Sequence, residues 1–315
     1  NCLVHENEET TNPTSFVGMH LIGKAQSGTD ALSTIVRDTK VENNNGGSSG
    51  LRVEANSAAA QSLAVTVERT AVLNNQATST AGLQIEYGQN SAPLAMSLSA
   101  VTVAKNQVSV AVASTEPQIA SPAYVSGVVF TISNLTDRIH LANVTTAFNT
   151  ATNNVDGHIT AAGFFGLLFD APRSISFANV SVVGNAVTQA TPTPVGSLPA
   201  IFLANVKFAA PPDNSPQSIE SGGQTQNMLI TGNTFNGTSS SCRDDLDATS
   251  LAGLPGPFNM TPANGGHNMT DDANCTNFSY YANLYSTVDH DVKDNGGPVP
   301  TVKLLPGSPA INGGG

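Results

Sequence analysis

The stretch LAVTVERTAVLNN, residues 63–75, decides the fold class of this chain. Its apolar and polar residues alternate with a period of two from Leu63 to Val67, which is the pattern of a β-strand with one buried face. The stretch ends on Asn74 and Asn75. Asparagine suits tight turns because it tolerates the left-handed backbone conformation. The sequence therefore predicts a half-buried strand that leads into an asparagine turn.

This pattern repeats along most of the chain. Alternating runs return at 96–103, 139–144 and 175–182, and asparagine marks turns at 43–44, 74–75, 106, 149, 185 and 233. A short strand signal that opens on glycine lies between these runs, at 18–22, 50–54, 82–86, 127–130 and 166–169, and a last one at 200–203 opens on alanine. The first three signals are about 32 residues apart. The repeat unit is therefore three short strands and an asparagine turn, without a helix.

Such a repeat predicts an all-β protein with the fold of a parallel β-helix. Parallel strands need a crossover connection, and in a solenoid each coil is itself the crossover. Successive coils pair strand on strand, bury a narrow core and can hydrogen-bond through stacked asparagine side chains. The alternative is an antiparallel β-sandwich, but its two-residue hairpins are scarce here, apart from Asn45-Gly46 and Asn236-Gly237. We expect the coils to occupy residues 1–238.

The C-terminal part, residues 239–315, has a different composition. Strand periodicity fades while Gly, Pro, Asn and Asp increase. We expect a loop held by a disulfide between Cys242 and Cys275, followed by a segment that packs on the last coil. Such a bridge would restrain the loop and indicates an oxidising compartment; two buried thiols are the alternative. Cys2 is then left over, to pair outside this chain or to stay free.

Composition argues against several classes of function. The chain has 315 residues, with 23 acidic against 12 basic side chains, and its net charge of −11 does not suit nucleic acid. No stretch approaches the roughly 18 apolar residues of a membrane helix. Hydrophobic residues make up 39% of the chain, which is too much for a disordered protein. We therefore expect a folded protein with neither a nucleic-acid partner nor a membrane span.

Residues 294–312 read DNGGPVPTVKLLPGSPAIN. This segment resembles a signature, roughly DNGGPTPTHALLPGSPAIDAG, near the end of bacterial secreted or cell-surface β-helix repeat proteins of the choice-of-anchor type. The upstream stretch 265–275 is similar to an Asp-rich piece of the same family. The resemblance implies a right-handed parallel β-helix and an exported, extracellular or cell-surface protein. The chain departs from the signature at Asn312, where the family has Asp, and since the sequence ends at Gly315 we expect any anchoring region to be missing or removed.

Parallel β-helices also include polysaccharide lyases and glycoside hydrolases, and hydrolysis needs two carboxylates about 5 to 9.5 Å apart. The nearest candidates for catalysis are Asp244, Asp245 and His267, in the loop-rich C-terminal part. The Asn-x-Asp and Arg-x-Lys partners of such enzymes are absent, and a solvated turn explains the cluster equally well. We therefore expect no enzymatic activity and keep a carbohydrate-active enzyme or glycan-binding protein as the alternative.

Two groups of carboxylates are candidates for a metal. Asp289, Asp291 and Asp294 lie in one short segment, and clustered oxygen ligands favour calcium; an acidic surface turn is the alternative. Glu54 and Glu86 occupy equivalent positions in successive coils, so their carboxylates either share a cation or splay into solvent. Calcium is the only cofactor that the sequence suggests.

The first residues, 1–7, parallel the strand and asparagine turn at 39–44. We therefore expect the chain to begin inside a coil, where uncapped strand edges invite another chain. It is either a fragment whose upstream coils were lost or a subunit that stacks end to end into a fibre. The leading expectation is an extracellular structural or adhesive protein that self-associates through open ends or binds a host-surface or glycan ligand.

Overall fold

The computed structural model describes residues 2–8, 18–24, 31–56, 62–87, 94–110, 124–133, 136–154, 160–169, 175–190, 201–206, 223–241, 260–262, 266–275 and 278–311. Their regular secondary structure is nearly all β-strand, as the sequence predicts. Their helical content is limited to two short 3-10 turns, η1 (Leu284–Thr287) and η2 (Pro309–Ile311). Nowhere in these ranges is a helix long and apolar enough to cross a membrane.

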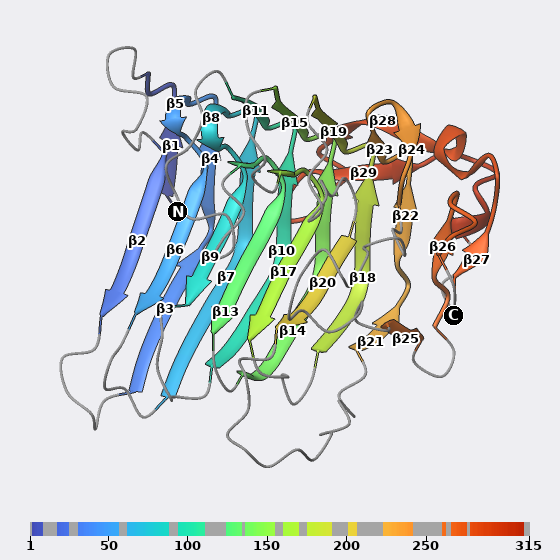
Figure 1. Cartoon of the computed structure of the whole chain (residues 1–315). Helices are drawn as coiled ribbons and strands as arrows, with labels where there is room; N and C mark the ends of the chain where they lie inside the picture. Colours follow the sequence, from blue (N-terminus) through green and yellow to red (C-terminus); the bar gives the residue numbers. More distant parts are fainter. Residues whose placement is uncertain are drawn as a thin grey trace.

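The strands form three large sheets, and the one made of the shortest strands lies along the upper edge of the molecule in Figure 1. Sheet A contains β1 (Cys2–His5), β3 (Ala31–Arg37), β4 (Thr39–Glu42), β7 (Ser62–Leu73), β10 (Leu94–Ala104), β14 (Thr136–Ala147), β18 (Ile175–Val183), β21 (Gly223–Gln226), β22 (Leu229–Thr231), β25 (Met260–Pro262), β26 (Met269–Thr270) and β27 (Ser279–Tyr280). Sheet B contains β5 (Asn45–Ser48), β8 (Gln76–Thr80), β11 (Gln107–Val110), β12 (Tyr124–Val125), β15 (Thr150–Asn153), β16 (Thr160–Ala161), β19 (Ala186–Gln189), β23 (Thr234–Phe235) and β24 (Thr238–Ser239). Sheet C contains β2 (Met19–Lys24), β6 (Leu51–Asn56), β9 (Leu83–Tyr87), β13 (Val128–Ser133), β17 (Phe164–Phe169) and β20 (Ile201–Val206).

The chain passes from sheet A to sheet B to sheet C and then returns to sheet A beside its previous strand. β7, β8 and β9 illustrate one repeat, and β10, β11 and β13 are their neighbours in the next. Pairing within the three sheets is parallel, except between β23 and β24. The hairpin β28 (Val288–Lys293) and β29 (Thr301–Leu304) is the other antiparallel pair in the described ranges. This pairing contradicts the antiparallel sandwich considered as the alternative fold.

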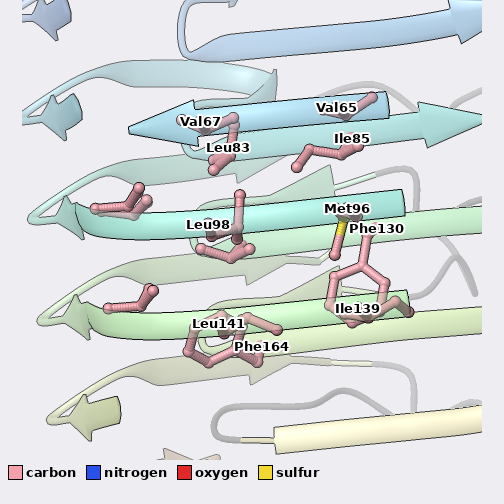
Figure 2. Packing of buried hydrophobic residues seen from close by; sticks show 14 of the residues in the cluster. Val65, Val67, Leu83, Ile85, Met96, Leu98, Phe130, Ile139, Leu141 and Phe164 are labelled. Carbon is pink, nitrogen blue, oxygen red and sulfur yellow. The ribbon is translucent and has the colours of Figure 1, made fainter. Parts of the chain in front are cut away.

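The core lies between sheets A and C. Val65 and Val67 from β7 meet Leu83 and Ile85 from β9 (Figure 2). Below them in the figure follow side chains of later repeats, namely Met96, Leu98, Phe130, Ile139, Leu141 and Phe164. Alternation explains this arrangement, because every second residue of each strand points inward. Phe164 is fully buried and packs edge-on against Phe177, with ring centroids 6.4 Å apart. The core therefore continues through the repeats as the alternating runs predict.

The position of the fifth glycine signal was predicted incorrectly. In the structure Val128 pairs with Phe164 and Phe130 pairs with Gly166, so Gly166 lies inside β17 rather than at its start. Gly163 occupies the opening position, because its carbonyl accepts the Val128 N–H at 2.8 Å. From the sequence, either Gly163 or Gly166 could open this strand. Pairing with β13 shows that Gly163 does.

Candidate functional site

A ladder of buried asparagines links the repeats at the turn between sheets A and B. Each side-chain amide donates to the Oδ1 of the next asparagine at 2.8–3.0 Å, and each backbone N–H donates to the same oxygen at 3.0–3.2 Å. From Asn44 onward the amide also donates to a carbonyl of the preceding repeat. The ladder contains Asn7, Asn44, Asn75, Asn106, Asn149, Asn185 and Asn233. The predicted hydrogen bonds between stacked asparagine side chains are therefore confirmed, and in each bond between two asparagines the donor lies one repeat before the acceptor.

A column of glycines also runs from repeat to repeat, and each glycine lies against the carbonyl oxygen of the glycine in the next repeat. A Cβ atom on Gly18 or Gly50 would lie 2.1 Å from the carbonyl oxygen of the next glycine, and one on Gly82 would lie 2.0 Å from the Gly127 oxygen. Real Cβ atoms do not approach backbone oxygen this closely, so the column excludes every other residue type. The same carbonyls accept backbone N–H groups from the repeat before, such as Leu51 N–H to Gly82 O at 2.9 Å.

Three inward-facing residues of the first repeat are less buried than their partners in the second repeat. Val4, Met19 and Leu21 point inward but are only partly buried. Their partners in the next repeat, Val41, Leu51 and Val53, are 0% exposed. Leu3 and Ile22 on the same two strands are 54% and 49% exposed, in part because their side chains face outward. We name β1, β2 and Asn7 the N-terminal edge.

The C-terminal end of the core carries an aromatic residue. Phe278, which like Val4, Met19 and Leu21 is partly buried, packs against the core cluster that contains the fully buried Ile230. β26 and β27 extend sheet A beyond β22 by short parallel pairs. Tyr280 and Tyr281 at this last strand are 53% and 40% exposed. The two ends of the molecule therefore differ in chemistry.

Residues 284–311, which we name the C-terminal strap, fold back over the outer face of sheet A (Figure 1). Leu284, Val288 and Val299 of the strap are buried against a column of outward-facing residues. That column comprises Leu73, Ala104, Ala147 and Val183, and Ala71 and Leu229 lie in the row beside it. Thr102 donates a hydrogen bond to the Pro300 carbonyl at 2.5 Å. The segment that carries the family-like signature therefore reaches several repeats back, well beyond the last coil on which we expected it to pack.

Tyr285 fixes the strap at two glycines. A Cβ atom on Gly232 would lie 2.2 Å from the Tyr285 ring. A Cβ atom on Gly184 would lie 3.0 Å from the Tyr285 hydroxyl. Both glycines have positive φ angles. The ring also stacks on His290 with centroids 4.3 Å apart. Burial raises the pKa of the Tyr285 phenol, and the nearby Asp271 carboxylate adds to that shift.

The two stacked glutamates on sheet C are bridged by an arginine. Glu54 and Glu86 pair in register, as expected from the repeat. Arg52 Nη2 donates to Glu86 Oε2 at 2.6 Å, and its Nε lies 2.9 Å from Glu54 Oε1 without the alignment of a hydrogen bond. His20 Nε2 also lies 2.9 Å from Glu54 Oε1. A guanidinium, rather than a shared metal or bulk solvent, therefore relieves the repulsion of the two carboxylates.

The remaining predicted residues do not form one site. Asp244, Asp245 and Cys242 lie outside the described residues, and His267 is exposed at the surface. The predicted disulfide of Cys275 with Cys242 therefore stays a prediction, while Cys2 is free and exposed. Asp289 is paired with Lys293 at 2.9 Å and Asp291 with Lys105, and Asp294 accepts the Gly296 N–H at 2.8 Å. Within the described ranges no group of three or more His, Cys, Asp or Glu residues is placed to hold a metal, so calcium also stays a prediction.

A second column in the middle of sheet A was not predicted. Asp38, Arg69, Ala100, Asn143, Asn179 and Asn227 all have positive φ angles near 50° and interrupt successive strands at the same position. Asn179 and Asn227 each donate a side-chain hydrogen bond to the asparagine before, at 3.1 and 3.0 Å. The signal for this column was the repeated Ala-Asn-Val at 142–144 and 178–180. These hydrogen bonds lie on the exposed face of sheet A, so they link neighbouring repeats outside the core.

No protein-family model, curated protein or solved structure matches this chain.

Proposed function

We propose that this chain is a right-handed parallel β-helix that acts as a structural or adhesive rod outside the cell. The A-to-B-to-C path with parallel neighbours supports the helix, and crossovers between parallel strands are almost always right-handed. The strap sequence, with its resemblance to exported β-helix proteins, supports the extracellular location. Backbone and side-chain hydrogen bonds link successive repeats along the described part of the chain. Such continuous bonding suits a load-bearing element.

The observation that carries this proposal is the stacking of equivalent positions from repeat to repeat. The asparagine ladder joins the repeats through side-chain hydrogen bonds, and the glycine column brings their backbones into close contact. Each repeat buries its apolar face only against its neighbours, so this stacking favours a stiff rod.

Electron microscopy of the native material tests this function. We expect stiff, narrow rods at the surface or in the extracellular fraction of the source cells, with this chain at one end of the rod-forming unit. Diffuse intracellular staining with chain-specific antibodies, or native particles without rods, would contradict the proposal.

The charged group on sheet C favours a second candidate, a glycan-binding or carbohydrate-active protein. His20, Arg52, Glu54 and Glu86 form a mixed row of donors and acceptors on one outer strand face. Such a row can hydrogen-bond sugar hydroxyls, and a pair of carboxylates is the usual machinery of glycoside hydrolysis. A glycan-degradation and glycan-binding screen, with and without calcium, discriminates the candidates. Glycan cleavage by the unmodified chain that is lost in Asp244→Ala and Asp245→Ala would favour this second function. So would glycan binding that is lost in Glu54→Gln.

A further inference from the structure

A left-handed turn residue lies directly before each ladder asparagine from Asn44 to Asn233. The φ angles of these residues lie between 53° and 69°. Asparagine and glycine tolerate this conformation, whereas lysine and phenylalanine are strained in it and persist where their surroundings hold them. We name these residues the turn column: Asn43, Asn74, Lys105, Phe148, Gly184 and Gly232. The turn alone therefore does not explain Lys105 and Phe148.

The strap contacts the turn column where its residues depart from asparagine. Lys105 forms an ion pair with Asp291 of the strap. Phe148 is partly buried against the same apolar cluster as the strap. Tyr285 lies over both glycines, since a Cβ atom on either of them would come within 3.0 Å of it. The last four positions of the column therefore all lie beside the strap.

The first two positions show what the turn column carries away from the strap. Asn43 and Asn74 are exposed, and within the described ranges no hydrogen bond or ion pair joins either of them to the strap. Both have the residue type that suits the left-handed turn. The change from asparagine to lysine, phenylalanine and glycine along the column therefore matches the charge, the apolar surface and the ring that the strap presents.

The strap is attached to sheet A without strand pairing. Its own strands, β28 and β29, pair with each other. Within the part of the chain that the structure describes, the polar contacts with sheet A and its turns are the hydrogen bond from Thr102 to the Pro300 carbonyl and the ion pair of Lys105 with Asp291. The other contacts come from buried apolar residues of the strap. The strap can therefore leave sheet A without breaking a strand-to-strand hydrogen bond.

The strap also joins repeats that are not neighbours. Its contacts run from Thr102 and Lys105 at the end of β10 to Gly232 after β22. In a solenoid each repeat is stabilised by its own interactions and by its nearest neighbours, so repeats can unfold one after another. A contact that spans β10, β14, β18 and β22 adds stability that is lost when any of these repeats opens. Closure of the strap therefore favours unfolding of these repeats as one unit.

We infer that the strap is a latch that opens and closes as one unit over the turn column, and that its closure makes the repeats from β10 to β22 unfold together. The turn column is its docking site: Lys105 receives Asp291, and the two glycines receive the Tyr285 ring. This inference goes beyond the proposed function and does not depend on it, because it concerns how the fold opens.

Native-state hydrogen exchange in low concentrations of urea tests the latch. In the unmodified chain we expect the amides of β28 and β29 to exchange together and faster than those of β14, because the latch opens before the coils. The amides of β10, β14, β18 and β22 should share one larger free energy of opening. Exchange of β28 at the same free energy as β14 would overturn the inference, since the strap and the coils would then open only together.

Lys105→Asn separates the latch from the turn. Asparagine suits the left-handed backbone at this position, as it does at Asn43 and Asn74, so the coils should lose no stability. The ion pair with Asp291 is lost, so exchange of β28 should accelerate by about two- to threefold, as for an exposed pair. Asn74→Lys is the matched control: it places a lysine in the same conformation away from the strap and should destabilise β7 without changing β28. Unchanged exchange of β28 in Lys105→Asn would contradict the docking role of Lys105.

Tyr285→Ala removes the ring from both glycines and should weaken the latch further. Exchange of β28 and β29 is expected to accelerate by about tenfold or more, and the opening free energies of β10, β14, β18 and β22 should separate from one another. Tyr281→Ala, at a 40% exposed tyrosine before the strap, is the control and should leave both properties unchanged. A common opening free energy of the four strands in Tyr285→Ala would show that the repeats unfold together without the latch, and would overturn the inference.

Discussion

At the scale of single residues, the fold depends on side chains that fit one repeated position and no other. The buried asparagines satisfy each other's amide and carbonyl groups, so no polar atom of the ladder is left unpaired between Asn44 and Asn185. The glycines fill a column in which any side chain would collide with backbone. These two requirements explain why Asn and Gly recur in the sequence at the spacing of the repeat.

Asn106→Ala is expected to lower the free energy of unfolding by about 2–4 kcal/mol, because it removes the Oδ1 that accepts from Asn75 Nδ2 and N–H and the amide that donates to Asn149 Oδ1 and the Val72 carbonyl. Urea denaturation measures the loss. Gln107→Ala is the control, since Gln107 is the exposed neighbour in the same turn. Equal stability of the two variants would show that the ladder contributes nothing beyond its neighbours.

Gly82→Ala is expected to destabilise the chain by at least about 2 kcal/mol, because the new methyl group would lie 2.0 Å from the Gly127 carbonyl oxygen. Gly297→Ala is the matched control: its Cβ would make an ordinary contact of 3.6 Å with the Val299 oxygen. Thermal unfolding of both variants checks the difference. A Gly82→Ala chain as stable as the control would mean that the coils separate at little cost.

At the scale of elements, the strap is the feature that joins distant parts of the chain. It covers the outward column of sheet A and adds the ion pair of Asp291 with Lys105. The hydrogen bond from Lys105 lowers the pKa of the Asp291 carboxyl, against a smaller opposing effect of burial. The pair is largely exposed, so its contribution to stability is small and sensitive to salt.

Acid is expected to loosen the strap before the coils. Because the folded pKa of Asp291 lies below its ordinary value of 3.8, the pair stabilises the strap fully above that value and loses this effect as pH falls through the folded pKa. Hydrogen exchange of β28 between pH 5 and pH 2.5 checks this expectation. In Asp291→Asn the acid-dependent change should shrink. An unchanged profile in that variant would assign the loosening to other carboxylates.

At the scale of the whole molecule, the two ends of the described core differ in residue type. Aliphatic Val4, Met19 and Leu21 lie at one end and aromatic Phe278 at the other, and all four are partly buried against the core. Native-state exchange should be faster at the edge strands β1 and β2 than at β10, which has a paired strand on each side.

Phe278→Ala is expected to open the C-terminal end of the core and lower stability by about 1–3 kcal/mol, because the phenyl ring is partly buried against the core cluster. Exchange of the β22 amides should accelerate as well. Tyr280→Ala, at a 53% exposed position two residues away, is the control and should change little. Comparable effects of both variants would show that Phe278 does not cover the core.

The sequence by itself determined the strand pattern, the asparagine turns and the glycine column. These features follow from the local alternation of apolar residues, from the left-handed conformation that asparagine tolerates and from the space that only glycine leaves. The tertiary structure alone decided that Gly163 rather than Gly166 opens β17, that Arg52 lies between Glu54 and Glu86, and that the strap reaches back over sheet A. Each of these depends on which residues far apart in the chain come into register. The same holds for the N-terminal edge, whose openness is visible only beside the covered second repeat, because burial is a property of neighbours and not of a sequence position.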